Sequence, residues 1–166
     1  MMTFVNTRNP GLVIQPTHRM IVNMPDFEKA ALLTKLSSDF SIKIFGFATP
    51  LQKQSAREAM FDRMVKLGRQ GRNIFGLYAG GTAFYTLLLN PADAMAQAAE
   101  KMSYAARGLD VNVLHLLILE KHLGICDAKL ASQSHIHYIK DLGDAIDKSI
   151  AAVDSDAPAE LLLLKP

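Results

Sequence analysis

The sequence predicts an α+β fold, with a mainly antiparallel mixed sheet packed with helices, and three observations support this. Apolar residues fill nearly every direction of a helical wheel over residues 110–123, which is typical of a buried helix. Two β-prone runs, 73–79 and 82–89, flank Gly80-Gly81, a pattern typical of a tight hairpin. The other strand and helix patterns follow one another without the regular alternation of a parallel α/β fold.

The apolar helix at 110–123 is the centre of this prediction. Asp110 can cap its first turn by accepting a backbone N–H bond, and Gly124 can end it in the left-handed conformation. At about 1.5 Å per residue the helix spans roughly 21 Å, which is too short to cross a bilayer. We therefore expect it to be the core helix of a domain that does not enter a membrane.

The remaining elements are predicted from hydrophobic periodicity and from helix start and stop residues. Thr49-Pro50 is a typical helix start, with a capping threonine and a proline in the first turn. The residues that this helix should bury are Leu51, Met60, Met64 and Leu67. The expected strands are 1–6, 11–15, 15–22, 41–47, 73–79, 82–89, 136–139 and 160–164, and the expected helices are 25–37, 50–67, 91–106, 110–123 and 142–153.

The composition is typical of a single globular domain, which we place at residues 1–166. Of the 166 residues, 49% are hydrophobic and 20% are charged, and the net charge of +2 gives no strong field for nucleic acid or an anionic membrane. The lone cysteine, Cys126, fits a reducing compartment, and no charged leader precedes an apolar run, so we expect a cytoplasmic protein. Both ends break off at apolar runs, which predicts a fragment of a longer protein.

Two groups of residues resemble ligand-binding motifs, but their context favours a structural role. The stretch 76–81 is as rich in glycine as a phosphate loop, yet a second strand follows it and it has no lysine, so a hairpin is favoured. His135 and His137 would point the same way from a strand, as metal ligands can, but no third ligand is evident nearby. We expect an outward strand face there, with Ile136 and Tyr138 inward, and no bound metal.

The other histidines and the cationic residues leave alternatives open. His115 and His122 share one face of the core helix but lie about 10 Å apart along it, too far for both to bind one metal ion. His115 is therefore either a hydrogen-bonded core residue or part of a pocket wall. A cluster of basic residues lies along the helix at 50–67 and just beyond its end. Its acidic neighbours favour a solvated face over a nucleic-acid site. Its members are Lys53, Arg57, Arg63, Lys66, Arg69 and Arg72.

Thr17-His18-Arg19 is the polar triplet whose chemistry best suits a binding site. It combines a hydroxyl, an imidazole and a guanidinium just after Pro16, which should end regular strand pairing or mark an edge. These three groups are suited to binding and protonating a phosphate or a carboxylate. The alternative is an edge strand whose polar side chains simply point outward.

Several of these residues belong to motifs that resemble a known family. The motifs are Phe4-Val5-Asn6, the run 11–19 ending in Pro-Thr-His-Arg, Leu109-Asp-Val, Leu114-His115 and Leu123-Gly-Ile125. Together they resemble a bacterial and archaeal family catalogued as domain of unknown function 1015, and the similarity extends from Phe4 to Pro166. Complete members carry an upstream Asp-Gly-His-His-Arg motif and a downstream stretch rich in proline, lysine and tyrosine, and neither is in this sequence.

The resemblance implies that the chain is the C-terminal portion of a nucleotide- or phosphate-handling enzyme. The upstream family motif is similar to the ParB/sulfiredoxin-like superfamily, which includes nucleotide hydrolases and free-serine kinases. The residues that match recurrent polar positions of the family, and that we therefore expect to bind ligand, are Thr17, His18, Arg19 and His115. Without the upstream motif we expect the fragment itself to be inactive.

A second hypothesis is a non-catalytic binding or assembly module, DNA-associated by the ParB analogy. It would need a continuous basic face with aromatic residues, and the sequence does not show one. The expected partners are the missing N-terminal and C-terminal segments of the same protein and a nucleotide or small anionic substrate. A homo-oligomer is compatible with the sequence, which identifies no cofactor and no catalytic residue.

Overall fold

The computed structural model describes residues 17–24, 27–90, 95, 103–125, 135–140, 144–155 and 159–164. In these residues the chain forms a six-stranded sheet in the order β2-β4-β3-β6-β1-β5. The strands are β1 (Thr17–Val22), β2 (Phe40–Gly46), β3 (Ile74–Tyr78), β4 (Ala83–Leu89), β5 (Ile136–Lys140) and β6 (Ala159–Leu164). The helices are α1 (Lys29–Leu36), α2 (Pro50–Gly68), α4 (Tyr104–Arg107), α5 (Asp110–Val113), the π-helix η1 (Leu114–His122) and α7 (Asp144–Asp154).

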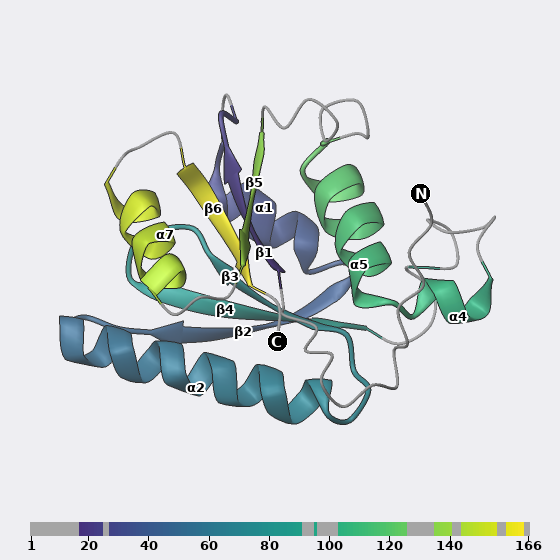
Figure 1. The fold of residues 1–166 in the computed structure, drawn as a ribbon, viewed down its shortest axis with the longest axis horizontal. Coiled ribbons are helices and arrows are strands. Elements are labelled where there is room, and N and C mark those ends of the chain that lie inside the picture. The colour runs from purple at the N-terminus through teal and green to yellow at the C-terminus, as the bar shows by residue number, and fades with distance from the viewer. Residues whose placement is uncertain are drawn as a thin grey trace, which may run out of the picture.

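The predicted α+β class is confirmed, because every described strand pair is antiparallel and helices cover the sheet on both sides. Helices α2 and α7 pack on one side, which we call the α2/α7 face, around Met60, Met64 and Ile150. Helices α1 and η1 pack on the other side, the η1 face. Figure 1 shows α2 running along one edge of the molecule, α7 in front of the strands and α1 behind them.

The core helix predicted at 110–123 is present as α5 followed without a break by η1. Leu114, Leu117 and Ile118 are buried, as the sequence predicts. The stretch is not buried all round, however, because Val111 is 45% exposed and Glu120 is exposed too. The helix lies against one side of the sheet, so its outer surface meets solvent although the sequence there is apolar.

The predicted hairpin is confirmed by strands β3 and β4, which pair antiparallel with Leu77 opposite Tyr85. Gly80 and Gly81 both have positive φ, at 68° and 81°, which a residue with a side chain rarely adopts. Two successive left-handed residues are the conformation of a tight hairpin turn. The glycine-rich stretch is therefore a turn and not a phosphate loop.

Three smaller predictions are wrong in detail. Leu51 is 77% exposed, because it lies in the first turn of α2 on the side away from the sheet. Tyr138 is 49% exposed instead of inward, because η1 does not cover β5 at that point. The helix predicted to begin at residue 25 is described from Lys29, after extended backbone at Glu28.

Some predicted elements lie outside the described residues. They are the strands at 1–6 and 11–15, most of the helix at 91–106, and Cys126. The described part of that helix region is α4, which starts at its own N-cap, Ser103, whose hydroxyl accepts a bond from the Ala106 N–H at 3.3 Å. In the part of the chain that the structure describes, no helix is both long and apolar enough to span a membrane.

Candidate functional site

Strand β1, which carries the predicted Thr17-His18-Arg19 triplet, is an interior strand. It pairs with β5 on one side and with β6 on the other, so the edge-strand alternative is wrong. His18 is only 1% exposed, so its imidazole does not point into solvent. Two flanking strands and a covering helix therefore enclose a side chain that an edge strand would have left accessible.

The alternation of a strand separates the residues of the triplet. Val22 belongs to the core of the α2/α7 face, whereas Ile21 belongs to that of the η1 face. Because side chains alternate along a strand, His18 lies on the α2/α7 face, and Arg19 lies on the η1 face. Thr17 is the first residue of β1, and His115 belongs to the helix that covers the η1 face. His18 therefore lies on the opposite side of the sheet from Arg19 and His115.

Arg19 is half-buried beside its cross-strand partner Tyr138. Its guanidinium carbon lies 5.6 Å from the centre of the Tyr138 ring, within cation–π range. Burial lowers the pKa of Arg19 from its usual value, but an arginine remains charged near neutral pH.

A cavity of the described residues lies on the α2/α7 face, between these two helices. This groove has a volume of about 670 Å³, which is within the range of small-molecule sites. Both charged side chains and apolar side chains line it. The lining residues are Pro50, Lys53, Gln54, Arg57, Glu58, Phe61, Asp62, Phe84, Asp147 and Ile150.

The start of α2 fixes how its side chains enter the groove. The Thr49 hydroxyl accepts a hydrogen bond from the Gln52 N–H at 3.3 Å, and the Gln52 side chain accepts one from the Ala48 N–H at 2.8 Å. This reciprocal cap, with Pro50 in the first turn, sets the helix start. Lys53 and Arg57 then follow four residues apart and point to the same side.

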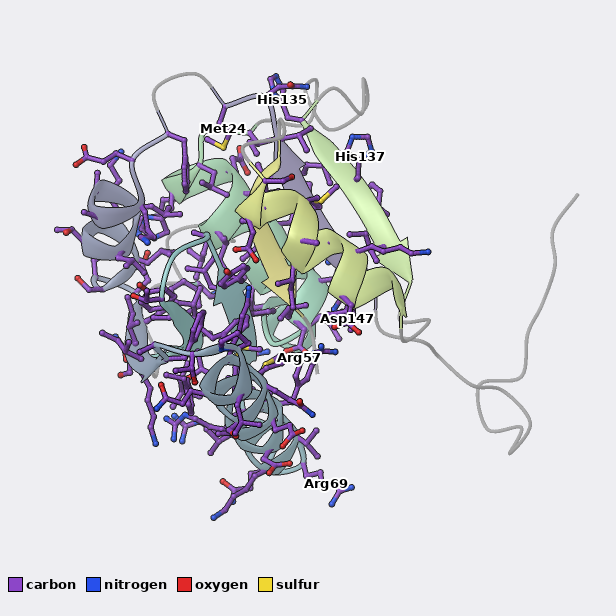
Figure 2. All side chains as sticks on the ribbon, turned by 90° about the vertical axis from the view of Figure 1, so that its left-hand side faces the viewer. Met24, Arg57, Arg69, His135, His137 and Asp147 are labelled. Carbon is purple, nitrogen blue, oxygen red and sulfur yellow. The ribbon has the colours of Figure 1, made fainter. Side chains whose placement is uncertain are left out.

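Both cations of the groove meet carboxylates of α7. The Lys53 Nζ lies 2.5 Å from an oxygen of Asp154, and the Arg57 guanidinium pairs with Asp147. Figure 2 shows Arg57 and Asp147 pointing toward one another between the two helices. These two ion pairs bridge α2 and α7 across the groove.

Aromatic side chains surround Lys53. Its Nζ lies 5.0 Å from the centre of the Tyr78 ring and 5.6 Å from that of Phe47. The buried Tyr78 hydroxyl donates a hydrogen bond to Asp154, the same carboxylate that Lys53 contacts. Burial, followed by this interaction with Asp154, raises the pKa of Tyr78 well above its usual value. Tyr78 is therefore a neutral hydrogen-bond donor beside Lys53, one of the residues that line the groove.

A second buried polar cluster lies on the η1 face. One oxygen of Asp39 accepts hydrogen bonds from His122 Nε2 at 2.7 Å and from Lys121 Nζ at 2.8 Å. Burial raises the pKa of Asp39, but the hydrogen bonds and charges of Lys121 and His122 outweigh it and lower the pKa overall. The Asp39 side chain is 8% exposed and that of His122 is 5% exposed, so ligand has little access to this cluster.

The sequence did not reveal which residues meet in the groove. The sequence predicts a solvated face for Lys53 and Arg57, and no local pattern pairs these cations with Asp147 and Asp154 or places Tyr78 beside them. The available signal was a spacing of four between the cations and of seven between the aspartates, which puts each pair on one helical face. Among the described residues, no group of three or more His, Cys, Asp or Glu side chains could hold a metal ion.

The family description "Protein of unknown function (DUF1015)" matches residues 1–112 of the chain. The chain belongs to this family. The DUF1015 match confirms the family predicted from the motifs, and it spans β1 to β4 and the whole of α2. Helix α7, with Asp147 and Asp154, lies beyond the matched residues. No curated protein and no solved structure matches the chain.

Proposed function

We propose that this DUF1015 chain is part of a nucleotide- or phosphate-handling enzyme, and that the groove between α2 and α7 binds the anionic ligand. One observation carries the proposal: Lys53 and Arg57 enter a cavity of about 670 Å³ from one side of α2. The other two basic residues of α2, Arg63 and Lys66, do not line this cavity. The groove therefore presents two cations to a ligand, and an anionic ligand is the class that the family resemblance implies.

The groove offers complementary contacts to the two parts of such a ligand. An ammonium and a guanidinium form strong charge-assisted hydrogen bonds to phosphate oxygens, and arginine can do so with two bonds. Phe61, Phe84 and Ile150 offer an apolar surface for an organic group, such as a nucleotide base or sugar.

The existing ion pairs do not prevent anion binding. The side chains of Lys53 and Arg57 are 27% and 29% exposed, and those of their partner aspartates are 36% and 61% exposed. Ion pairs at such exposure contribute only about 0.2–1 kcal/mol. A hydrogen bond to a charged group contributes about 1.5–3 kcal/mol, so a phosphate can replace a carboxylate.

Among the predicted ligand-binding residues, His18 lies on the same face of the sheet as the groove. Helix α7 packs on β5 and β6, the two neighbours of β1, and it shares this face of the sheet with the buried His18. The ligand-binding role of Thr17, Arg19 and His115 stays a proposal for a separate region on the η1 face.

The proposal is tested by titrating the chain calorimetrically with ATP and with inorganic phosphate. The expected result is that Lys53→Ala and Arg57→Ala each weaken ATP binding by about 1.5–3 kcal/mol, which is about ten- to hundredfold in Kd. Both variants should keep nearly the melting temperature of the unmodified chain, because the lost ion pairs are partly exposed.

Arg69→Ala is the matched control, because it removes the same charge from the end of α2 remote from Arg57 (Figure 2). It should leave binding unchanged. The proposed function is wrong if the unmodified chain binds neither ATP nor phosphate, or if Arg69→Ala weakens binding as much as Arg57→Ala. Equal competition by duplex DNA of random sequence would instead favour the DNA-associated module.

A further inference from the structure

We infer that Asp147 and Asp154 are internal competitors that occupy the anion positions beside the two cations of the groove, and that its ligand therefore carries two anionic groups. This inference rests on the proposed function. Each of the two groove cations meets one α7 carboxylate, and a carboxylate presents oxygens to an ammonium or a guanidinium much as a phosphoryl group does.

The spacing of the cations defines two anion positions. Lys53 and Arg57 lie one turn apart, about 6 Å along α2. Their partners lie seven residues apart on α7, so two separate carboxylates, and not the two oxygens of one, satisfy the cations. A ligand that replaces both must likewise bring two anionic groups, as two linked phosphoryl groups do.

The geometry lets the carboxylates leave at low cost. Asp147 is the more exposed partner of its pair, with 61% of its side chain accessible against 29% for Arg57, so water can solvate it when it is displaced. Asp154 also accepts the Tyr78 hydroxyl, so it keeps a hydrogen bond when Lys53 turns to another anion. The cations, in contrast, stay at the wall of the cavity.

Helix α7 does not depend on the ion pairs for its position. Ile146, Ile150 and Val153 are buried in the core of the α2/α7 face and hold the helix on the sheet. An incoming anion can therefore replace the carboxylates while α7 remains packed. A ligand with little negative charge then does not displace the two aspartates from Lys53 and Arg57.

The test compares inorganic pyrophosphate with orthophosphate as calorimetric probes of the unmodified chain, Asp147→Asn and Asp154→Asn. Each variant removes one competitor and keeps the size of the side chain. We expect each to bind pyrophosphate about two- to fivefold more tightly, the factor that corresponds to an exposed ion pair. Orthophosphate, with a single phosphoryl group, should bind more weakly than pyrophosphate to every form.

Asp62→Asn is the matched control, because Asp62 also lines the groove and pairs with neither Lys53 nor Arg57 in the structure. It should change pyrophosphate affinity less than the α7 variants do. If the unmodified chain binds pyrophosphate and Asp147→Asn and Asp154→Asn bind it equally or less well, the competitor inference is wrong and the proposed function stands. If neither the unmodified chain nor any variant binds either probe, while circular dichroism shows that the proteins are folded, the competitor inference and the proposed function are both wrong.

Discussion

At the scale of single residues, the partly exposed carboxylate Asp154 and the buried carboxylate Asp39 differ in what they can do. Asp154 pairs with Lys53, which lines the groove, and also accepts a hydrogen bond from Tyr78, so it can lose one partner and keep the other. Asp39 is enclosed and receives two hydrogen bonds on one oxygen from neighbouring residues of η1. The first arrangement suits ligand exchange, and the second suits the permanent attachment of η1 to the start of β2.

The attachment through Asp39 predicts a specific dependence of stability on pH. The folded chain holds the pKa of Asp39 below its usual value, so the carboxylate stabilises the fold above the unfolded pKa, about 3.9, and this contribution is lost as pH falls through the folded pKa. Asp39→Asn should cost about 1–3 kcal/mol near neutral pH, because a charged acceptor of two hydrogen bonds is removed. Urea denaturation at pH 7 and at pH 3 measures both effects.

In that experiment the cost of Asp39→Asn should be smaller at pH 3, because this pH is below the unfolded pKa and protonation of Asp39 in the unfolded chain reduces the stability that its charge contributes. Asp62→Asn, at an exposed position of α2, should change stability little at either pH. An Asp39→Asn cost that is the same at both values would show that the charge of Asp39 does not stabilise the fold.

At the scale of elements, the packing of α2 on the sheet depends on Gly76, which has no side chain. A Cβ added at Gly76 of β3 would lie 2.8 Å from Met64 Sδ, 3.2 Å from Met60 Sδ and 3.0 Å from Leu164 Cβ. The two methionine tips can move, but Leu164 Cβ is fixed by its own strand. The glycine thus permits α2, and with it the wall of the groove, to approach the sheet closely.

Gly76→Ala should therefore destabilise the chain. Overpacking costs about 1–3 kcal/mol, which exceeds the gain of about 0.4–1 kcal/mol from a less flexible unfolded chain. Gly46→Ala is the matched control in strand β2, because its nearest contact would be the Thr82 carbonyl oxygen at 3.9 Å. Thermal melting should show a lower Tm for Gly76→Ala and an unchanged or higher one for Gly46→Ala. A higher Tm for Gly76→Ala would mean that the methionines repack freely.

The sequence predicts these elements well because their signals are local. Thr49-Pro50 and Gly80-Gly81 fix a helix start and a turn through their own backbone preferences, and the structure has both. The candidate site depends on pairing over long distances in sequence, such as Arg57 with Asp147, which no local pattern encodes. A related reason separates His18 from Arg19: in a strand with a neighbour on each side, adjacent residues point to opposite faces of the sheet, and the ligand-binding role of the triplet stays a prediction.

At the scale of the whole molecule, the sheet separates two hydrophobic cores. One contains Leu117 and Ile118 with the η1 face, and the other contains Met60 and Ile74 with the α2/α7 face. Strands β3 and β4 contribute side chains to both, since their residues alternate between the faces. Damage to either core should therefore be transmitted to the other through shared strands, so that the described parts unfold together.

Ile118→Val and Ile74→Val test this cooperativity from opposite sides of the sheet. Both isoleucines are fully buried, so each substitution should cost about 0.5–1.5 kcal/mol. Because the two residues belong to different cores and share no cluster, their costs should add to within about 0.5 kcal/mol in the double variant. The chain has no tryptophan and four tyrosines, so tyrosine fluorescence and far-ultraviolet circular dichroism can follow urea unfolding together. Coincident transitions are expected for all four forms. If Ile118→Val shifts one signal and leaves the other in place, the two cores unfold separately, and the groove on the α2/α7 face can persist when η1 has detached.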